Sequence, residues 1–326
     1  MQSEKNTNKI LFLCYHYLKR DDEYARIYGY ELEQFKTQVD KILQEFEPIN
    51  VRKILDYRNG EGSIPKKSVV FAFDDGLKEH AEFFAPYLAS KNISAIFSTP
   101  ACIFENRMAN PQIVHFLTAK YGIRNLNETM EKYFDVTGMQ FSDFFEKDKS
   151  KLPLMEFYKY LKKVLFYKLP VEKTELLLNK IYEEVLKKDD PDILSKVYMN
   201  KDDLKKIKSM GHEIGCHTYS HPIFTRLDLN DDIWFNEIIR AKKIIESIID
   251  DRIISFSYPY NNNREEFDYF GWRDRLRNTG FELAFNTYNR KGAWQGEFDP
   301  YWVKRYSVQS GDDFNEIKNN AFIYQI

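Results

Sequence analysis

The chain has 326 residues, enough for one large domain or two small ones, and 43% of them are hydrophobic, so a sizeable core is expected. The formal net charge of −2 offers no basic surface of the kind that binds nucleic acid. The three cysteines, Cys14, Cys102 and Cys216, form an odd and unpatterned set, which argues against a disulfide framework and for a reducing compartment.

The N-terminal segment is polar through Lys9, and the apolar stretch 10–15 that follows is too short for the hydrophobic region of a signal peptide. No run in the chain approaches the roughly 18 apolar residues needed to span a bilayer. We therefore expect a cytoplasmic protein with no membrane span.

The first hundred residues alternate between strand and helix patterns. Apolar runs predict buried strands, whereas apolar residues three and four positions apart predict helices. Strands are expected at 10–17, 68–73 and 94–99. Helices are expected at 31–46 and 77–91. The segment 59–67 contains two glycines and a proline and is expected to be a surface loop.

Residues 105–197 are rich in Lys, Glu, Leu, Tyr and Phe and poor in glycine, and apolar residues recur at helical spacing in 154–165 and 176–186. We interpret them as a helical insertion into one domain made of residues 1–104 and 198–326. Three roles are open: a lid, a substrate-binding subdomain, or a dimerisation arm that would make the protein a homo-oligomer. A role in substrate access is favoured, because insertions at a catalytic face often shape specificity.

The alternation resumes after this segment. Helices are expected at 200–210, 231–250, 265–279 and 312–322. Strands are expected at 213–217, 253–259, 283–287 and 301–308. Strands separated by helices predict an α/β protein with a mainly parallel sheet. By itself the alternation fits both a (β/α) barrel and an open, doubly wound sheet.

Two neighbouring carboxylates, Asp74 and Asp75, follow the strand 68–73 and precede Gly76. In parallel α/β sheets, functional groups gather beyond the carboxyl ends of the strands. Two carboxylates there repel each other unless a cation or a proton offsets their charge. Taken alone, however, the pair is better explained as a strand-to-helix turn in which Asp75 caps the helix.

His217 and His221 provide the partner that the two aspartates need. They lie at the end of strand 213–217, and one helical turn across four residues would bring both imidazoles to one face. Two histidines and a carboxylate make a three-ligand metal site with open positions for water and substrate. A histidine pair of this spacing is common on solvated helices, but its combination with the aspartate pair at another strand end favours a metal site.

At these residues the sequence resembles carbohydrate esterase family 4, the NodB-like polysaccharide deacetylases. The family's three motifs are matched by Phe-Asp-Asp-Gly at 73–76, His-Thr-Tyr-Ser-His at 217–221 and Phe-Ser-Tyr-Pro-Tyr at 256–260. The resemblance implies a distorted, incomplete (β/α) barrel of about seven strands, which selects the barrel over the open sheet. It also implies a second strand at 48–55, because this family sets a helix and a strand before its first motif.

The resemblance is strongest to the branch that contains the poly-N-acetylglucosamine deacetylases. That branch opens with a strand ending in Tyr-His, as residues 11–16 do, and closes with a strand carrying Arg, as residues 302–308 do. About residues 9–104 and 198–310 are covered, and the segment between them is not explained by the resemblance.

The resemblance implies that Asp75, His217 and His221 hold a divalent metal ion and that Asp74 is the general base. Histidine and carboxylate ligands suit zinc, and they also suit cobalt, nickel or iron. Such an ion lowers the pKa of water toward about 7 and so promotes hydrolysis of an N-acyl group.

The same resemblance implies an oxyanion site near the third motif. The metal and a backbone N–H near Tyr260, after Pro259, would stabilise the tetrahedral oxyanion formed on the acyl carbon.

The chain departs from the family pattern in two places. The late Leu-x-Leu-x-His motif that usually supplies the general acid is missing. In the poly-N-acetylglucosamine deacetylase branch the acid comes from the N-terminal Tyr-His strand, so His16 is our candidate for the general acid. A core histidine is the alternative. Ser257 stands where an arginine usually pairs with the base, so Arg305 is our candidate for that charge, with a surface ion pair as the alternative.

We expect a metal-dependent hydrolase that removes an N-acetyl group from an amino sugar or glycan during surface-polysaccharide synthesis. One alternative keeps the site and changes the amide, giving a deformylase or another amidohydrolase on a related sugar or cyclic amide. The other alternative is a catalytically inactive glycan-binding protein.

Overall fold

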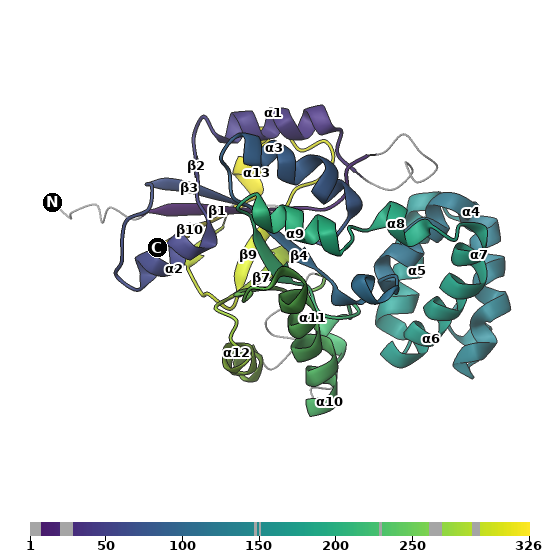
Figure 1. The fold of residues 1–326 in the computed structure, drawn as a ribbon. Helices are drawn as coiled ribbons and strands as arrows, with labels where there is room; N and C mark the ends of the chain where they lie inside the picture. Colours follow the sequence, from purple (N-terminus) through teal and green to yellow (C-terminus); the bar gives the residue numbers. More distant parts are fainter. Residues whose placement is uncertain are drawn as a thin grey trace.

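A ring of seven strands forms the centre of the molecule (Figure 1), in a computed structural model that describes residues 8–19, 29–146, 149, 151–227, 230–260, 269–288 and 294–326. The strands of the ring are β1 (Lys9–Tyr15), β3 (Lys67–Phe73), β4 (Ile96–Thr99), β5 (Glu213–Cys216), β6 (Ser255–Ser257), β7 (Leu283–Tyr288) and β9 (Val303–Ser307). Neighbours pair in parallel in the order β1–β3–β4–β5–β6–β7–β9, and β9 pairs with β1 to close the ring. The expected (β/α) barrel is confirmed, one strand short of the usual eight.

Three further strands extend the sheet outside the ring. β2 (Glu47–Pro48) pairs in parallel with β3. β10 (Phe322–Gln325) runs antiparallel to β1, and β8 (Trp294–Glu297) pairs with β10. Neither β8 nor β10 was expected from the sequence.

Helices surround the barrel and form a second group beside it. Those around the barrel are α1 (Leu32–Ile42), α2 (Val51–Arg58), α3 (Ala85–Ser90), α9 (Lys201–Ser209), α10 (Asp231–Trp234), α11 (Arg240–Ile249), α12 (Tyr269–Asn278) and α13 (Phe314–Asn320). Those between β4 and β5 are α4 (Asn110–Tyr133), α5 (Leu154–Lys163), α6 (Val171–Ile181), α7 (Lys187–Asp189) and α8 (Ile193–Val197). The second group lies together at one side of the barrel in Figure 1.

The expected strand at 48–55 is wrong, because this segment is mostly helix α2. Pro48 ends the short β2, and the side chain of Asn50 caps the helix by accepting a hydrogen bond from Lys53 N at 2.9 Å. Val51 and Ile54 are buried at helical spacing. The capping residue and the three-residue spacing were both visible in the sequence and indicate a helix.

The helices expected after the insertion are confirmed, within a few residues at their ends. Asn200 begins α9 with a capping box, in which its side chain accepts from Asp203 N and Asp203 accepts from its backbone N–H. The stretch 231–250 is α10 and α11 joined by a π-helical turn at Phe235–Ile239. For the expected helix 265–279, the part from residue 269 is α12, and 265–268 lie outside the described residues.

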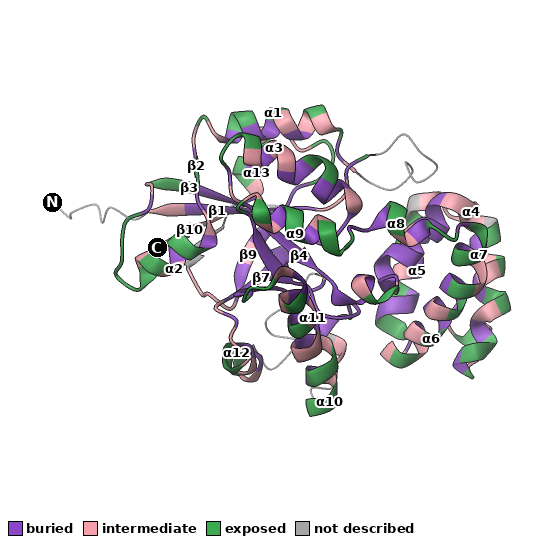
Figure 2. Ribbon diagram, viewed as in Figure 1, coloured by how far each residue is buried: buried purple, intermediate pink, exposed green. Residues whose placement is uncertain are grey.

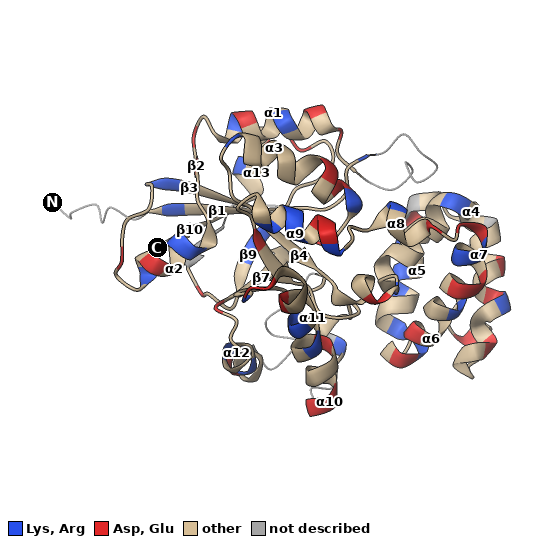
Figure 3. Ribbon diagram, in the orientation of Figure 1, with Lys and Arg blue, Asp and Glu red and all other residues tan. Residues whose placement is uncertain are grey.

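Side chains alternate between the inside and the outside of the barrel. The inside is filled by a core cluster of Ile10, Phe12, Val70, Ala72, Ile96, Leu283, Phe285 and Val303, with a few neighbours. The outward residues pack against the helices in a larger cluster that also continues into α4, α5 and α6. In Figure 2 the strands of the ring are accordingly buried, and in Figure 3 the charged residues of both signs lie mainly on the helices.

The chain that returns from α8 is tied back to the turn after β3. Tyr198 forms an isolated antiparallel β-bridge with Leu77, and Met199 N donates a hydrogen bond to Gly76 O at 3.1 Å. Within the described part of the chain, no helix has the length and apolar character required to cross a membrane.

Candidate active site

The polar residues singled out in the sequence gather at one end of the barrel. Asp74 and Asp75 follow β3, His217 follows β5, and His16 follows β1. Because all strands of the ring are parallel, their carboxyl ends meet at the same rim, which is where (β/α) barrels carry their functional groups.

Four residues other than glycine have a left-handed backbone at this rim. The φ angle is 82° at Asp75, 66° at Thr218, 62° at His221 and 60° at Tyr260. Residues other than glycine rarely adopt such φ angles, and those that do are concentrated at functional sites. The local strain therefore coincides with the motif residues.

Asp75, His217 and His221 converge on one point. Asp75 Oδ1 lies 3.4 Å from His217 Nε2 and 3.3 Å from His221 Nε2, and all three side chains are buried. No hydrogen-bond donor among the described residues satisfies the buried Asp75 Oδ1. His217 Nδ1 lies 2.8 Å from Ser257 O and must donate to this carbonyl, which leaves the Nε2 lone pair facing Asp75. This donor set fits a divalent cation.

The two histidines meet through a tight turn and not through the helical turn that the sequence suggested. Residues 217–223 form no helix. Thr218 Oγ1 accepts a hydrogen bond from His221 N at 3.0 Å, and the left-handed backbone of Thr218 reverses the chain. The two imidazole rings end 4.6 Å apart and nearly perpendicular.

Charges in the site shift the pKa values of these three groups. Burial alone would raise the pKa of Asp75, but the two imidazoles outweigh it and hold that pKa well below its usual value. Burial also opposes a charge on His217, yet Asp74 and Asp75 raise its pKa. The pKa of His221 is lowered, mainly by burial. Asp75 is thus ionised and His221 neutral at pH 7, as metal ligands need to be, whereas the raised pKa of His217 favours a proton that a bound cation would displace.

Asp74 turns into the barrel and pairs with Arg305 of β9. The guanidinium forms two hydrogen bonds with the carboxylate, Nη1 to Oδ1 at 2.9 Å and Nη2 to Oδ2 at 2.5 Å. Both side chains are almost completely buried. Burial disfavours the carboxylate, but the charge of Arg305 more than compensates and lowers the pKa of Asp74.

Two other residues form hydrogen bonds with the pair of Asp74 and Arg305. Cys14, on the inner face of β1, donates its thiol to Asp74 Oδ2 at 3.4 Å. Thr287 of β7 accepts from Arg305 Nη2 at 3.3 Å. Ser257, which stands where the family usually has arginine, bonds instead to Ser98 Oγ at 2.8 Å. The cation beside Asp74 therefore comes from β9 and not from the third motif.

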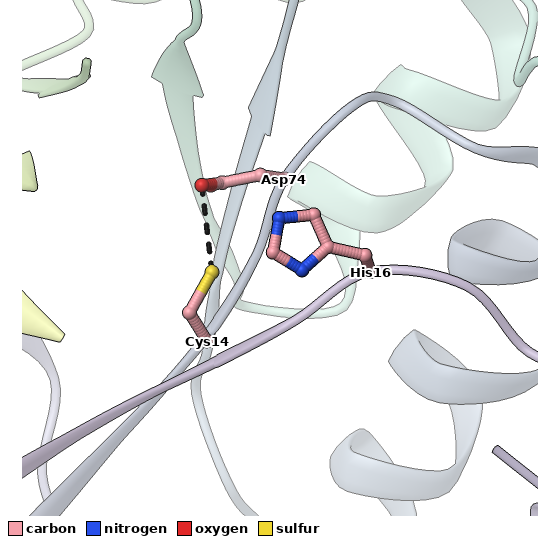
Figure 4. Close-up of side chains that lie close together, drawn as sticks. All are labelled: Cys14, His16 and Asp74. Carbon is pink, nitrogen blue, oxygen red and sulfur yellow. Dashed lines mark hydrogen bonds between the residues drawn. The ribbon is translucent and has the colours of Figure 1, made fainter. Parts of the chain in front are cut away.

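His16 lies next to Asp74 at the open end of β1 (Figure 4). Ligand atoms of Cys14, His16 and Asp74 are all within 4.8 Å of one another, and the His16 side chain is half-buried. The buried His80 donates its Nε2–H to His16 O at 2.9 Å. Because burial lowers the pKa of His80 to about 4, this histidine is neutral and acts as a fixed support.

Tyr260 covers the other side of the site. Its ring lies 4.9 Å from the ring of His221 and 5.6 Å from that of Phe166. Pro259 and Tyr260 come directly after β6 and its continuation at Tyr258, whose N donates to Phe285 O at 2.8 Å. The third motif is thus brought next to the second.

Comparison with known proteins agrees with this geometry. Residues 192–284 match the family model described as polysaccharide deacetylase, which covers the second and third motifs. The resemblance to the polysaccharide deacetylases is confirmed. No curated protein sequence matches the chain.

Several solved structures, deacetylases among them, share the fold over nearly the whole chain. The deacetylase PplD of Streptococcus pyogenes, solved with acetate, has a TM-score of 0.57 at 12% identity, covering 96% of this chain and 97% of that one. IcaB of Ammonifex degensii has a TM-score of 0.56 at 17% identity, covering 95% of both chains. A de-N-acetylase of Aggregatibacter actinomycetemcomitans has a TM-score of 0.55 at 14% identity, covering 95% and 99%. At these identities the likeness is one of fold.

One contact in this deacetylase-like site was missed from the sequence. Gln112 of α4 is fully buried and donates Nε2 to Asp75 Oδ2 at 3.0 Å. Its Oε1 accepts from Tyr198 OH at 3.3 Å, and Nε2 also lies 3.2 Å from Tyr17 OH. A glutamine in an amphipathic helix carries no sequence signal for such a role, whereas the position of Cys14 two residues before His16 could have placed that thiol on the same strand face.

A cleft opens beside His221, between the barrel and the helices that precede β5. The barrel supplies His221, Pro222, Ile223 and Tyr260, and the other wall is Asn110, Leu165, Phe166, Leu169, Val171 and Thr174. The walls are mostly apolar and the space between them is small, so an acyl group that reaches His221 would contact both.

Proposed function

We propose that this protein is a metal-dependent hydrolase that removes an N-acetyl group from an amino sugar or glycan in surface-polysaccharide synthesis. The observation that carries the proposal is the convergence of Asp75 Oδ1 with the Nε2 atoms of His217 and His221 at 3.3–3.4 Å, beside an ionised Asp74. The similar structures include a deacetylase and a de-N-acetylase, which supports this choice of reaction.

Asp75, His217 and His221 would hold the cation, with zinc favoured and cobalt, nickel or iron also compatible. When bound, it supplies Lewis-acid polarisation of the amide carbonyl and makes water more acidic. The hydrogen bond from His217 Nδ1 to Ser257 O orients the imidazole, and Gln112 holds the second oxygen of Asp75.

Asp74 would accept the proton of the attacking water. Its carboxylate is oriented by two hydrogen bonds from Arg305, which also keep it ionised in a buried position. We propose that a backbone N–H of the segment at Pro259 and Tyr260 helps to stabilise the oxyanion that forms on the acyl carbon.

His16 would donate a proton to the departing amine. It stands beside Asp74 with its ring half-exposed at the rim, and His80 fixes its backbone. A general acid on one strand end and a general base on the next can act on opposite sides of one tetrahedral centre.

We further propose that residues 105–197 form a helical insertion in a barrel domain made of 1–104 and 198–326. Gln112, and the cleft walls at Leu165 to Thr174, support a role for the insertion in completing the site and controlling substrate access.

The test begins with the metal content of the purified protein. Acetate and formate release is then measured from N-acetyl- and N-formylglucosamine and from oligomers of N-acetylglucosamine, with and without chelator. We expect one equivalent of a divalent metal, acetate release that stops with chelator, and its recovery when zinc or cobalt is added. Metal-loaded protein that releases neither acid from any of these sugars would contradict the proposal and leave the cyclic-amide hydrolase and the glycan-binding protein as alternatives.

A further inference from the structure

Lys162 of α5 places a positive charge at the site that no motif accounts for. Its Nζ lies 5.3 Å from the ring centre of Tyr158 and 5.8 Å from that of Tyr260. The ring of Tyr260 in turn contacts His221 at 4.9 Å. Tyr260 therefore links the ammonium group to His221, one of the proposed metal ligands.

No carboxylate among the described residues forms an ion pair with Lys162; its charge contacts only the two tyrosine rings. Two comparably shielded lysines do have a carboxylate partner: Lys78 lies 2.7 Å from Asp203, and Lys208 lies 2.7 Å from Asp251. A half-buried ammonium without an anion is unfavourable, because it has lost part of its hydration without a full replacement.

Lys162 interacts electrostatically with Asp75 of the site. Burial lowers its pKa, and the negative charge of Asp75 opposes that shift. A divalent ion on Asp75 would cancel this attraction, since the nearby Asp74 is already neutralised by Arg305. The loaded site would then carry an excess of positive charge and a cation free to meet a substrate anion.

Lys162 adjoins two residues that line the cleft beside His221, Phe166 and Tyr260. Phe166, one helical turn after Lys162, lies on the same side of the helix and forms part of the cleft wall. Phe166 and Lys162 both contact the ring of Tyr260. A sugar whose acyl group enters the cleft beside His221 would therefore hold its ring and other substituents outside the cleft, on the side where Lys162 lies over Tyr260.

We propose that Lys162 binds an anionic group, a phosphate or a carboxylate, on the amino-sugar substrate. The inference rests on the proposed deacetylase function and narrows its substrates to charged amino sugars, such as sugar phosphates or acidic sugars. Lys162 would act in binding and would not touch the amide that is cleaved.

The test compares neutral and charged substrates on the metal-loaded, full-length protein. Acetate release is measured from N-acetylglucosamine, its 1-phosphate and 6-phosphate esters, and N-acetylmuramic acid, whose charge is a carboxylate. The variants are Lys162→Met, which keeps the length of the side chain, Lys162→Arg, which keeps the charge, and the control Lys163→Met. Lys163 is the next residue of α5 and is exposed.

We expect the wild type to prefer at least one charged sugar over the neutral one. Lys162→Met should reduce that ratio of kcat/KM by about 10-fold or more, mainly through KM, because it removes a charge-assisted hydrogen bond. Lys162→Arg should keep most of the preference, and Lys163→Met should not change it. The phosphate and carboxylate substrates then show which anion the site accepts.

Two results would overturn the proposal: a wild type that does not prefer any charged sugar, or a Lys162→Met variant that loses activity equally on neutral and charged sugars. Calorimetry can compare the affinity of the protein for glucosamine 6-phosphate with its affinity for glucosamine. Because binding needs no turnover, this measurement tests the anion site separately from the proposed deacetylase activity. If no sugar is deacetylated but Lys162 still selects the phosphate in binding, the deacetylase assignment fails and the anion site stands.

Discussion

Asp74 and Asp75 are neighbours in the chain but have opposite surroundings. Asp74 continues the inward face of β3 and meets Arg305 inside the barrel, whereas the left-handed turn at Asp75 directs its carboxylate toward two histidines. Adjacent carboxylates can both stay ionised because each has its own source of positive charge or hydrogen bonding. This separation allows one to be a base and the other a ligand.

Replacing Asp74 by asparagine tests the role of the base. Asp74→Asn keeps the shape of the side chain but cannot accept a proton, so we expect acetate release to fall by about 10²–10⁴-fold. Metal content should remain that of the wild type, because Asp75 and both histidines are untouched.

A matched control is Asp202→Asn, at an exposed position in the first turn of α9. Since Asp74→Asn leaves Arg305 without a negative partner, a thermal melt must accompany the assay to show that the variant is folded. A folded, metal-loaded Asp74→Asn with wild-type kcat would exclude Asp74 as the base.

Gln112 is expected to position Asp75. Gln112→Met keeps the volume and removes the hydrogen bond to Asp75 Oδ2, so we expect metal affinity to fall by about 10–100-fold while the fold is kept. The measurement is a competition titration of the apo-protein with a metal-binding dye. Thr118→Val on the same helix, whose hydroxyl bonds only to Val114 O, is the control. Equal metal affinity in Gln112→Met and the wild type would contradict this role.

At the scale of elements, β4, β5 and β6 approach one another through small residues. Gly215 of β5 faces Ser98 of β4 and Ser255 of β6, and a Cβ added at Gly215 would lie 2.6 Å from Ser98 Oγ and 3.0 Å from Ser255 Oγ. Large residues such as Phe12 and Phe285 belong to the inner core cluster of the same barrel. Small side chains next to large ones let a narrow barrel fill without overlap.

Gly215→Ala should therefore destabilise the protein by overpacking, by about 1–3 kcal/mol in the free energy of unfolding. The measurement is urea denaturation. Ser98→Ala removes the oxygen with which the new methyl group would clash. The double variant should therefore lose less unfolding free energy than the sum of the losses in the two single variants. Strictly additive losses would mean that the contact with Ser98 is not the cause.

At the scale of the whole molecule, the site joins parts that are far apart in sequence. β3 and β5 carry the proposed ligands, β9 carries Arg305, and α4 and α5 from the segment between β4 and β5 add Gln112 and Lys162. Because the proposed ligands converge only in the folded chain, a metal ion should favour the native state over the unfolded one.

Adding zinc should accordingly raise Tm. At a free zinc concentration about 100 times Kd, the expected gain is about 2.7 kcal/mol in the free energy of unfolding. The measurement is a thermal melt of the chelator-treated protein at increasing zinc. His221→Ala removes one proposed ligand and should abolish most of the shift, and a shift of equal size in that variant would place the metal elsewhere.

Much of the architecture followed from local sequence patterns. The apolar runs at 10–15 and 69–73, and the helical spacing in 231–250, are properties of neighbouring residues, so strands and helices could be predicted from them. The motif residues could be placed at one rim because parallel strands end on the same side. The segment 48–55 shows the limit of this reasoning, since an expectation taken from the family outweighed the capping signal of Asn50.

Other features were decided only by the tertiary structure. Asp74 and Arg305 are 231 residues apart, and nothing in the sequence around Arg305 distinguishes a buried partner from a surface ion pair. Three other features likewise depend on which surfaces meet in space. They are the closure of the ring by β9 and β1, the hydrogen bond of Gln112 to Asp75, and the position of Lys162 over Tyr260. Periodicity specifies which face of an element is buried, but packing decides what that face touches.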